Sequence, residues 1–251
     1  VEASAYRAEL EAVEPRFSKD PRLSYVLHGY CHHVLPFVDE MMRRPSILDP
    51  VSAVLGNDLL VWGCTLFIKE PRTPDYVTWH QDLTYWGLDS TEEVTAWVAL
   101  SPATRESGCM RFVAGSHLRE IVEHRDTFAA GNMLSRGQEI AVEVDESEAV
   151  DVLLGPGQMS LHHGRTFHAS HANRSNDRRI GMAIRYIAPS MKQTGGRRTV
   201  AVLVQGEDRY GHFELAPPPT GILAPADLAL LERAEDLQRA ILYEGAARDG
   251  R

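Results

Sequence analysis

The sequence predicts a mainly β protein, a β-sandwich or barrel, supported by flanking α-helices. From residue 59 onward, short apolar and alternating runs replace the helical pattern that precedes them. Turn signals such as Gly155-Pro156-Gly157 separate these runs. The strands expected from these runs span residues 59–68, 94–100, 109–113, 140–144, 158–162, 180–187 and 199–204.

Helical patterns occupy the two ends of the chain. Residues 3–14 and 24–43 carry apolar side chains at spacings of three and four, with Pro36 as a kink in the second segment. A third helix is expected over residues 47–55, with Gly56 as its stop. A last helix is expected over residues 225–243, where Leu228, Leu231, Ala234 and Leu237 form one stripe.

We expect one domain over residues 1–251, because no internal repeat and no composition shift divides it. Its parts are a helical N-terminal region (1–56), a β core (about 57–205) and the C-terminal helix. The connection 126–137 has little periodicity, and it fits a lid over a barrel mouth as well as an ordinary surface loop. The first residue is Val1 rather than methionine, so the sequence does not decide whether the native N-terminus is present.

Composition excludes several classes of protein. The net charge is −9 and no run of basic residues occurs, which argues against nucleic acid and anionic membranes as partners. We expect neither a transmembrane segment nor a signal peptide. The three cysteines, Cys31, Cys64 and Cys109, are odd in number and widely spaced, as is typical of a reducing, cytoplasmic compartment.

A metal site is predicted by Trp79-His80-Gln81-Asp82. On an extended segment, residues two apart point to the same face, so the imidazole of His80 and the carboxylate of Asp82 would lie together. One later histidine would complete the facial two-histidine, one-carboxylate arrangement that suits ferrous iron with open positions. Arg179, at the start of the apolar run 180–187, would supply a fixed cation for an anion.

The second histidine must be chosen from four between residues 162 and 171. His162 and His163 are adjacent and point to opposite faces, so at most one could reach the metal. His168 is favoured because Ser170 would face the same way and could donate to a bound carboxylate. His163 is the next candidate. His171 would point away from that face.

Several motifs occur in an order that identifies a family resemblance. They are Leu66-Phe67-Ile68-Lys69-Glu70-Pro71, Trp79-His80-Gln81-Asp82-Leu83-Thr84-Tyr85-Trp86, Thr95-Ala96-Trp97-Val98-Ala99-Leu100, Gly108-Cys109-Met110-Arg111-Phe112-Val113-Ala114-Gly115-Ser116-His117, His162-His163, His168-Ala169-Ser170, Asn173-Arg174-Ser175 and Arg178-Arg179. With these motifs, the chain resembles the phytanoyl-CoA dioxygenase family of Fe(II)- and 2-oxoglutarate-dependent oxygenases over about residues 47–190.

The resemblance implies a double-stranded β-helix, the cupin-like jelly roll, with His80, Asp82 and His168 as metal ligands. It also implies that Arg179, helped by Ser170, pairs with the distal carboxylate of 2-oxoglutarate. A guanidinium suits that role because its fork can bind a carboxylate through two parallel hydrogen bonds.

Two further residues match family positions. Trp97 matches a position that lies against the co-substrate, although an inward tryptophan that fills the core is an equal alternative. Lys69 matches a recurrent lysine, and we expect it at a solvated strand end.

The function that the resemblance implies is oxidation of a small molecule with Fe(II), 2-oxoglutarate and O2. The reaction would be hydroxylation of a metabolite or natural-product intermediate, with release of succinate and CO2. Because Asp82 is present, hydroxylation, desaturation or ring chemistry is favoured over halogenation. The alternatives are a cupin-type non-redox isomerase or lyase, or a catalytically silent jelly roll that binds a small molecule.

The sequence identifies neither the substrate, nor the carbon attacked, nor the oligomeric state. Arg165 or Arg185 would suit an anionic group of the substrate. The other candidates for substrate contact are Thr78, Tyr85, Trp86 and Arg111.

Overall fold

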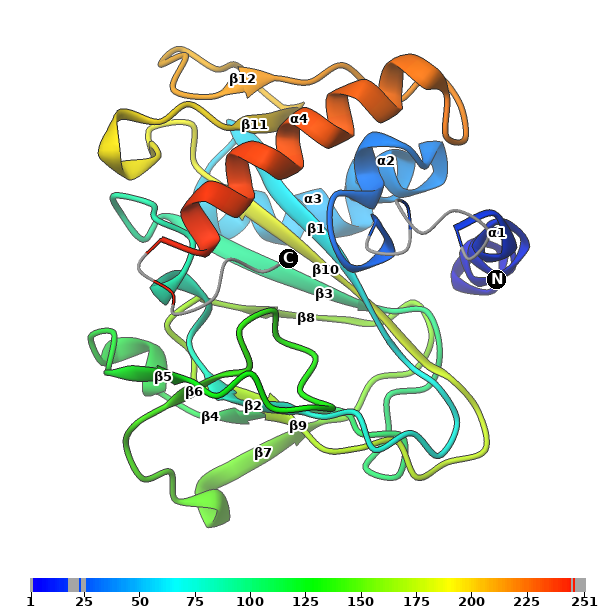
Figure 1. Cartoon of the computed structure of the whole chain (residues 1–251), viewed down its shortest axis with the longest axis vertical. Coiled ribbons are helices and arrows are strands. Elements are labelled where there is room, and N and C mark those ends of the chain that lie inside the picture. The colour runs from blue at the N-terminus through cyan, green and yellow to red at the C-terminus, as the bar shows by residue number, and fades with distance from the viewer. Residues whose placement is uncertain (1, 18–22, 24–25, 245, 247–251) are drawn as a thin grey trace.

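Two facing β-sheets form the body of the protein in the computed structural model, which describes residues 2–17, 23, 26–244 and 246 (Figure 1). The six-stranded sheet has the order β12-β11-β1-β10-β3-β8, and the four-stranded sheet has the order β2-β9-β4-β7. A small sheet pairs β5 with β6. The strands are β1 (Leu59–Lys69), β2 (Val77–His80), β3 (Glu93–Ala99), β4 (Met110–Val113), β5 (His124–Asp126), β6 (Gln138–Ile140), β7 (Ala149–Val152), β8 (Met159–His162), β9 (His168–Ser170), β10 (Arg179–Ile187), β11 (Val200–Gln205) and β12 (Glu214–Leu215).

The expected mainly β jelly roll with flanking helices is confirmed. The core strands are divided between the two sheets, with β1, β3, β8 and β10 in one and β2, β4, β7 and β9 in the other. Each core strand is followed by one of the opposite sheet, except that β4 is followed by β7, its neighbour in the same sheet. Neighbouring strands within these groups are antiparallel. This is the arrangement of a double-sheet jelly roll, whose interior lies between the sheets.

Helices cover the outer face of the larger sheet (Figure 1). Their apolar side chains, such as Val38, Leu48 and Leu231, belong to the same buried cluster as Ile184 and Tyr186 of β10. The main hydrophobic core therefore lies between the helices and this sheet. The helices are α1 (Glu2–Phe17), α2 (Pro36–Met42), α3 (Pro45–Leu55) and α4 (Pro225–Leu242).

Strand β10 separates this core from the interior of the jelly roll. It is hydrogen-bonded to β1 on one side and to β3 on the other. Its even-numbered residues, from Ile180 to Tyr186, face the helices and are buried in the core. Because side chains alternate along a strand, the odd-numbered residues face the opposite sheet. On that face, Arg179, Ala183 and Arg185 line a cavity.

The prediction of one helix over residues 24–43 is wrong in the described residues, and residues 24–25 lie outside them. Two short 3₁₀ turns, Val26–His28 and Cys31–His33, precede α2. Tyr30 adopts a left-handed conformation with φ of 63°, which interrupts any continuous helix. Pro36 begins α2 instead of kinking a longer helix, because its missing N–H is harmless at the first helical position.

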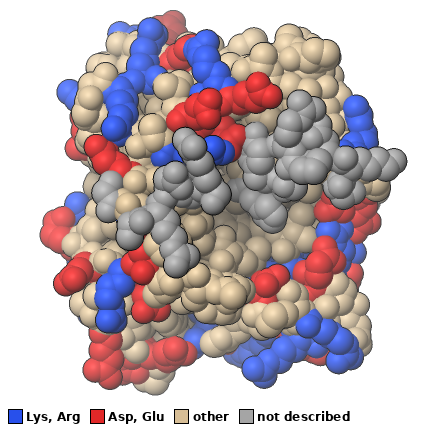
Figure 2. All heavy atoms as spheres, in the orientation of Figure 1, with Lys and Arg blue, Asp and Glu red and all other residues tan. Residues whose placement is uncertain are grey.

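The structure shows neither a surface of one charge in the view of Figure 2 nor, among the described helices, a membrane-spanning one. Acidic and basic side chains are interspersed on the face shown in Figure 2. No helix within the described residues has the length and apolar character needed to cross a bilayer.

Gly108 holds the loop before β4 against the segment that leaves β9. Its φ is +73°, and a Cβ there would lie 2.2 Å from the backbone oxygen of His171. Gly115, beyond β4, has a similar φ of +76°, but nothing lies within 4 Å of its notional Cβ. Gly115 is therefore required only for its backbone conformation, whereas Gly108 is required for its conformation and for the lack of a side chain.

We expect Gly108→Ala to destabilise the protein more than Gly115→Ala does. Both changes place a side chain at positive φ, at a cost of roughly 1–2 kcal/mol. At Gly108 the overlap with backbone adds about 1–3 kcal/mol. Urea unfolding of the two variants and the wild type would measure the difference, and equal shifts in midpoint would refute the steric argument.

Candidate metal centre

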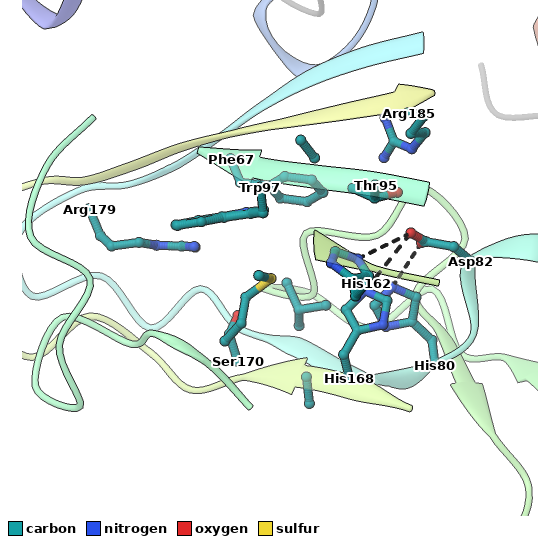
Figure 3. A pocket seen from close by; sticks show the side chains of 14 residues that line it. Phe67, His80, Asp82, Thr95, Trp97, His162, His168, Ser170, Arg179 and Arg185 are labelled. Carbon is teal, nitrogen blue, oxygen red and sulfur yellow. Dashed lines mark ion pairs between the residues drawn. The ribbon is translucent and has the colours of Figure 1, made fainter. Parts of the chain in front are cut away.

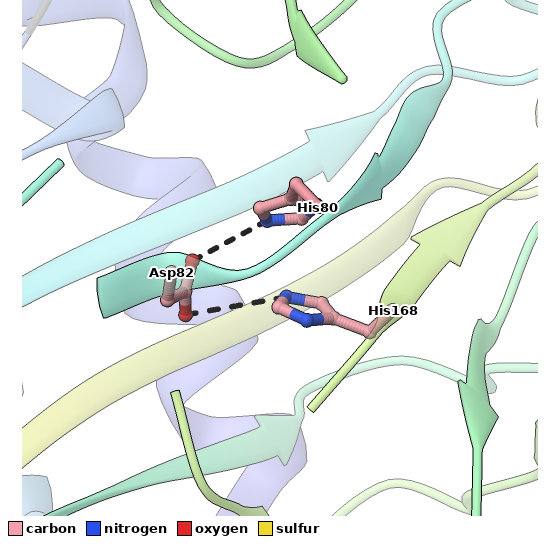
Figure 4. A group of neighbouring side chains, drawn as sticks. All are labelled: His80, Asp82 and His168. Carbon is pink, nitrogen blue, oxygen red and sulfur yellow. Dashed lines mark ion pairs between the residues drawn. The ribbon is translucent and has the colours of Figure 1, made fainter. Parts of the chain in front are cut away.

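Three side chains from separate elements, His80, Asp82 and His168, converge on one another (Figure 4). His80 ends β2 and His168 begins β9, and the register of these paired strands places the two residues opposite each other. Asp82 Oδ1 lies 3.3 Å from His80 Nε2, and Asp82 Oδ2 lies 4.0 Å from His168 Nε2. One potential ligand atom from each residue lies within 4.8 Å of the others. This donor set is the facial triad that suits a divalent metal such as Fe(II).

Backbone carbonyls orient both imidazoles. His80 Nδ1 lies 2.9 Å from the carbonyl oxygen of Thr78, and His168 Nδ1 lies 2.9 Å from that of Thr166. A carbonyl can only accept, so each Nδ1 carries the hydrogen and donates it. The lone pair of each Nε2 is then directed toward the shared centre, which is the tautomer that a metal requires.

Asp82 does not lie on the strand, contrary to the extended segment expected for His80 and Asp82. Strand β2 ends at His80, and Asp82 begins a 3₁₀ turn (Asp82–Thr84). Gln81 between them remains extended and is fully buried on the other side. Its side-chain amide donates to the carbonyls of Glu120 and Arg165, and its carbonyl accepts from the N–H of Val122.

The charges of this cluster are suited to metal binding. Burial opposes ionisation of Asp82, but the close contact with His80 Nε2 and the electrostatic attraction exerted by His168, His80 and Arg185 outweigh it and hold the pKa of Asp82 well below its usual range. Burial, followed by repulsion from His80, lowers the pKa of His168 well below its usual value. The carboxylate is therefore ionised and His168 is neutral near pH 7, as ligation requires.

The structure corrects the order of the remaining histidine candidates. His162 is the buried one, and its Nε2 lies 4.0 Å from Asp82 Oδ2. His163, the second candidate from the sequence, points away, and its Nε2 lies 3.1 Å from the carbonyl oxygen of Thr91. Strand β8 ends at His162. The sequence predicts that His162 and His163 point to opposite faces, but it does not predict which of them faces inward.

Arg179 lies at the opposite end of the cavity from the triad, with Trp97 between them (Figure 3). Its guanidinium carbon lies 5.3 Å from the centroid of the Trp97 ring. Gly181 makes room for this ring, because a Cβ there would lie 1.8 Å from Trp97 Cζ2. Trp97 therefore both fills the interior and forms a wall of the cavity.

Arg179 is a buried cation that lacks an ionic partner in the described residues. It is 1% exposed, and its Nε and Nη2 make no hydrogen bond to a described residue. Burial lowers its pKa to about 10, so it stays charged at neutral pH. A buried guanidinium with free donors is costly unless an anion is bound beside it.

Lys69 is not at a solvated strand end, so that expectation is wrong. It is fully buried and lies opposite Arg179 in the pairing of β1 with β10. Its Nζ lies 2.7 Å from Ser170 Oγ and 2.5 Å from the carbonyl oxygen of His171. Burial and the charge of Arg179 lower the pKa of Lys69 to about 6.

Some predicted substrate contacts face a second, larger cavity, and others do not. Tyr85 and Trp86 line that cavity, which also reaches His80 and Asp82. Thr78, Arg111 and Arg165 line neither cavity, because each is engaged elsewhere. Their partners are the carbonyl of Gln138, the carboxylate of Glu146 and the carboxylate of Glu120, respectively.

Sequence reasoning also missed residues of the larger cavity. Trp62, Tyr30 and Gln238 come from β1, the N-terminal turns and α4. Only the final packing brings these elements together, and no local pattern connects them. The connection 126–137 forms part of the cavity wall through Met133, Leu134 and Ser135.

Comparison with known proteins gives a consistent result. Residues 2–181 match the family model described as phytanoyl-CoA dioxygenase (PhyH). The protein is 29% identical over 161 residues to the "Probable alpha-ketoglutarate-dependent hypophosphite dioxygenase" of Stutzerimonas stutzeri, which covers 62% of this chain and 55% of the relative. It is 30% identical over 147 residues to the 1-deoxypentalenic acid 11-beta-hydroxylase of Streptomyces arenae, which covers 55% and 52%. The matches thus span little more than half the length of these relatives.

A solved structure is similar over almost its whole length. It is described as a non-heme monooxygenase, ThoJ, in the apo form, with a TM-score of 0.86 and 35% identity. The similarity covers 97% of this chain and 92% of that protein. A nickel complex of ThoJ has a TM-score of 0.82.

Loss of any one of the three ligands should abolish tight metal binding. We expect His80→Ala, Asp82→Ala and His168→Ala each to weaken Co(II) or Ni(II) binding by more than about 100-fold, beyond the 10–100-fold typical of outer-shell changes. His162→Ala removes a neighbouring imidazole that is outside the triad and should retain the metal. Calorimetric titration of the apoprotein measures this, and loss of binding in His162→Ala equal to that in the triad variants would contradict the assignment.

Proposed function

The chain belongs to the phytanoyl-CoA dioxygenase family, and on that premise we propose that it is an Fe(II)- and 2-oxoglutarate-dependent dioxygenase that hydroxylates a small organic molecule. The names of its relatives support the co-substrate, since one is called alpha-ketoglutarate-dependent and another is a hydroxylase. The site geometry supports both the metal and the co-substrate.

The observation that carries the proposal is an unpaired buried cation in the same cavity as a metal-ligand triad. The triad would hold the metal through two nitrogens and one carboxylate oxygen, which leaves positions for other ligands. Arg179 at the far end would receive an anionic group through its free Nε and Nη2. A dicarboxylate with a keto group beside one end satisfies both requirements at once.

Ser170 would assist Arg179, and Lys69 would position Ser170. A carboxylate bound beside Arg179 favours the charged ammonium of Lys69, which can only donate hydrogen bonds. The Ser170 Oγ, 2.7 Å from Lys69 Nζ, then accepts that hydrogen bond. Its own hydroxyl hydrogen is left to donate to the co-substrate in the cavity. Lys69 thus acts through Ser170, since it does not itself line the cavity.

Bound iron and 2-oxoglutarate would supply the oxidation of a C–H bond by O2, with succinate and CO2 as products. The protein's contribution is orientation and exclusion of water. Trp97 would cover one side of the co-substrate. The burial of His80 and His168 limits access of water to the metal site. Asp82 would occupy the coordination position that a halogenase leaves for chloride, so we propose hydroxylation rather than halogenation.

Addition of 2-oxoglutarate to the anaerobic Fe(II) protein should produce a weak visible charge-transfer band. Glutarate, which lacks the keto group, should not produce it, and neither should Asp82→Ala with 2-oxoglutarate. A cupin-type isomerase or a silent binding protein would give no band and no succinate. Failure of the wild-type protein to show the band would therefore reject the proposal, and a chlorinated product in chloride buffer would reject the hydroxylase assignment.

Ser170→Ala and Lys69→Met should each weaken 2-oxoglutarate binding by about two- to tenfold, the usual effect of one hydrogen bond. The double variant should lose little more than either single variant, because both changes remove the same directed hydroxyl. Ser160→Ala removes a buried hydroxyl that has no partner among the described residues and serves as the control. Titration of the charge-transfer band gives each affinity, and strictly additive losses would refute the coupling.

The same arrangement predicts a pH dependence. The pKa of Lys69 is about 6 in the free protein, and a bound carboxylate would raise it, so binding takes up a proton. Affinity for 2-oxoglutarate should therefore fall as the pH rises above about 6, and Lys69→Met should flatten that fall. Calorimetry in buffers of different ionisation enthalpy measures the proton uptake directly.

A further inference from the structure

A second cavity, of about 290 Å³, adjoins the metal centre. It shares His80, Asp82, Phe67 and Arg185 with the cavity that leads to Arg179. The triad thus lies where the two cavities meet. If the proposed function holds, 2-oxoglutarate takes the first cavity, and the second is left for the molecule that is oxidised. Its volume is close to the lower end of ligand pockets, roughly 300 Å³, so the part of the substrate that it holds is small.

The walls of this second cavity are largely aromatic and apolar. Trp62 and Trp86 stack with ring centroids 4.9 Å apart. Tyr30 and Tyr85 also line it, together with Met133, Leu134 and Leu242. Such walls favour a hydrophobic or aromatic body and provide little hydration for a charge.

Arg185 is the exception among these walls. It lies on β10 six residues after Arg179, on the same inner face of the strand. Its Nη1 donates to Thr65 Oγ1 at 2.8 Å, and its guanidinium carbon lies 5.4 Å from the Trp86 ring centroid. These contacts hold the guanidinium in place from one side and along one face.

The remaining edge of Arg185 is free. Its Nε is buried, and neither Nε nor Nη2 makes a hydrogen bond or ion pair with a described residue. By contrast, Arg136, beside Tyr85, is already paired with Asp126. Asp82, the other ionised group on the cavity wall, is a candidate metal ligand. The cavity therefore carries one oriented cation that has no ion-pair partner among the described residues.

We infer that this cavity binds a small organic acid, whose carboxylate pairs with Nε and Nη2 of Arg185 while its apolar or aromatic body packs against Trp62 and Trp86. This inference rests on the proposed function for the reaction that follows, and it adds the substrate class. The two free donors form the fork edge that matches a carboxylate. Gln238 of α4, which also lines the cavity, offers a second polar group. Arg185 is thus a specificity residue that fixes the orientation of the substrate in this cavity.

Matched acids and amides test the inference on the anaerobic Fe(II)–2-oxoglutarate protein. The probes are a panel of aryl and alkyl carboxylates, beginning with 3-phenylpropionate, each paired with its neutral primary amide. Calorimetric titration should show at least one acid bound more tightly than its amide. In Arg185→Gln the affinity for that acid should fall by at least about tenfold, in line with loss of a charged hydrogen bond, while the amide is unaffected.

Two control variants and the affinity for 2-oxoglutarate separate the possible outcomes. Arg209→Gln, at an exposed arginine paired with Glu207, should leave acid binding unchanged, and Arg185→Lys should keep part of the preference. If no acid is bound more tightly than its amide, the inference is overturned. It is also overturned if Arg185→Gln weakens 2-oxoglutarate in parallel with the acid, because Arg185 would then belong to the co-substrate site. Absence of the charge-transfer band in the wild type rejects the proposed function, while the acid and amide affinities of the Fe(II) protein still test the cavity.

Discussion

The register of β10 between β1 and β3 is the constraint on which the rest of the structure depends. One face of this strand presents Ile180, Met182, Ile184 and Tyr186 to the helices. The other face presents arginines to the interior of the jelly roll. A shift of one residue would turn the guanidiniums into the hydrophobic core and the aliphatic side chains into the site. The hydrophobic core and the charged site are therefore specified by the same hydrogen-bonded ladder.

The inner face of β10 shows how charge is distributed along the site. Arg179 and Arg185 lie at the two ends of this face, and small residues between them leave space. Neither guanidinium forms an ion pair with a described residue, and buried donors on each make no hydrogen bond to one. The negative charge of Asp82 is close to the histidines and is suited to a metal. The stability of the empty protein is lowered by this arrangement, and anionic ligands would restore it.

Much of the site could be predicted because its residues lie in short sequence motifs. His80 and Asp82 are two residues apart, and His168-Ala169-Ser170 is one of the short motifs that carry the family resemblance. Register between distant strands is a different matter. The burial of Lys69 follows from its place opposite Arg179, a pairing that joins residues more than a hundred positions apart. Sequence periodicity carries no information on that pairing. The sequence alone therefore predicts Lys69 at a solvated strand end.

The prediction of one helix over residues 24–43 is wrong for a related reason. Residues 26–34 have helical spacing of apolar side chains, yet they form short turns that fit between the sheet and α4. Tyr30 has a left-handed backbone there and lines the larger cavity. Likewise, Arg111 lies in a family motif and Thr78 directly precedes one, but their side chains face Glu146 and Gln138. Tertiary packing decided these positions, and a local pattern could not.

The contact between Gly181 and the Trp97 ring has a consequence for how such a protein can change over evolutionary time. The indole occupies the space in which any β-carbon at position 181 would lie. A larger residue at 181 is therefore compatible only with a slimmer side chain at 97, and the two positions should drift together among descendants of this chain. A lineage that exchanged both would reshape the chamber beside Arg179 without altering a single metal ligand.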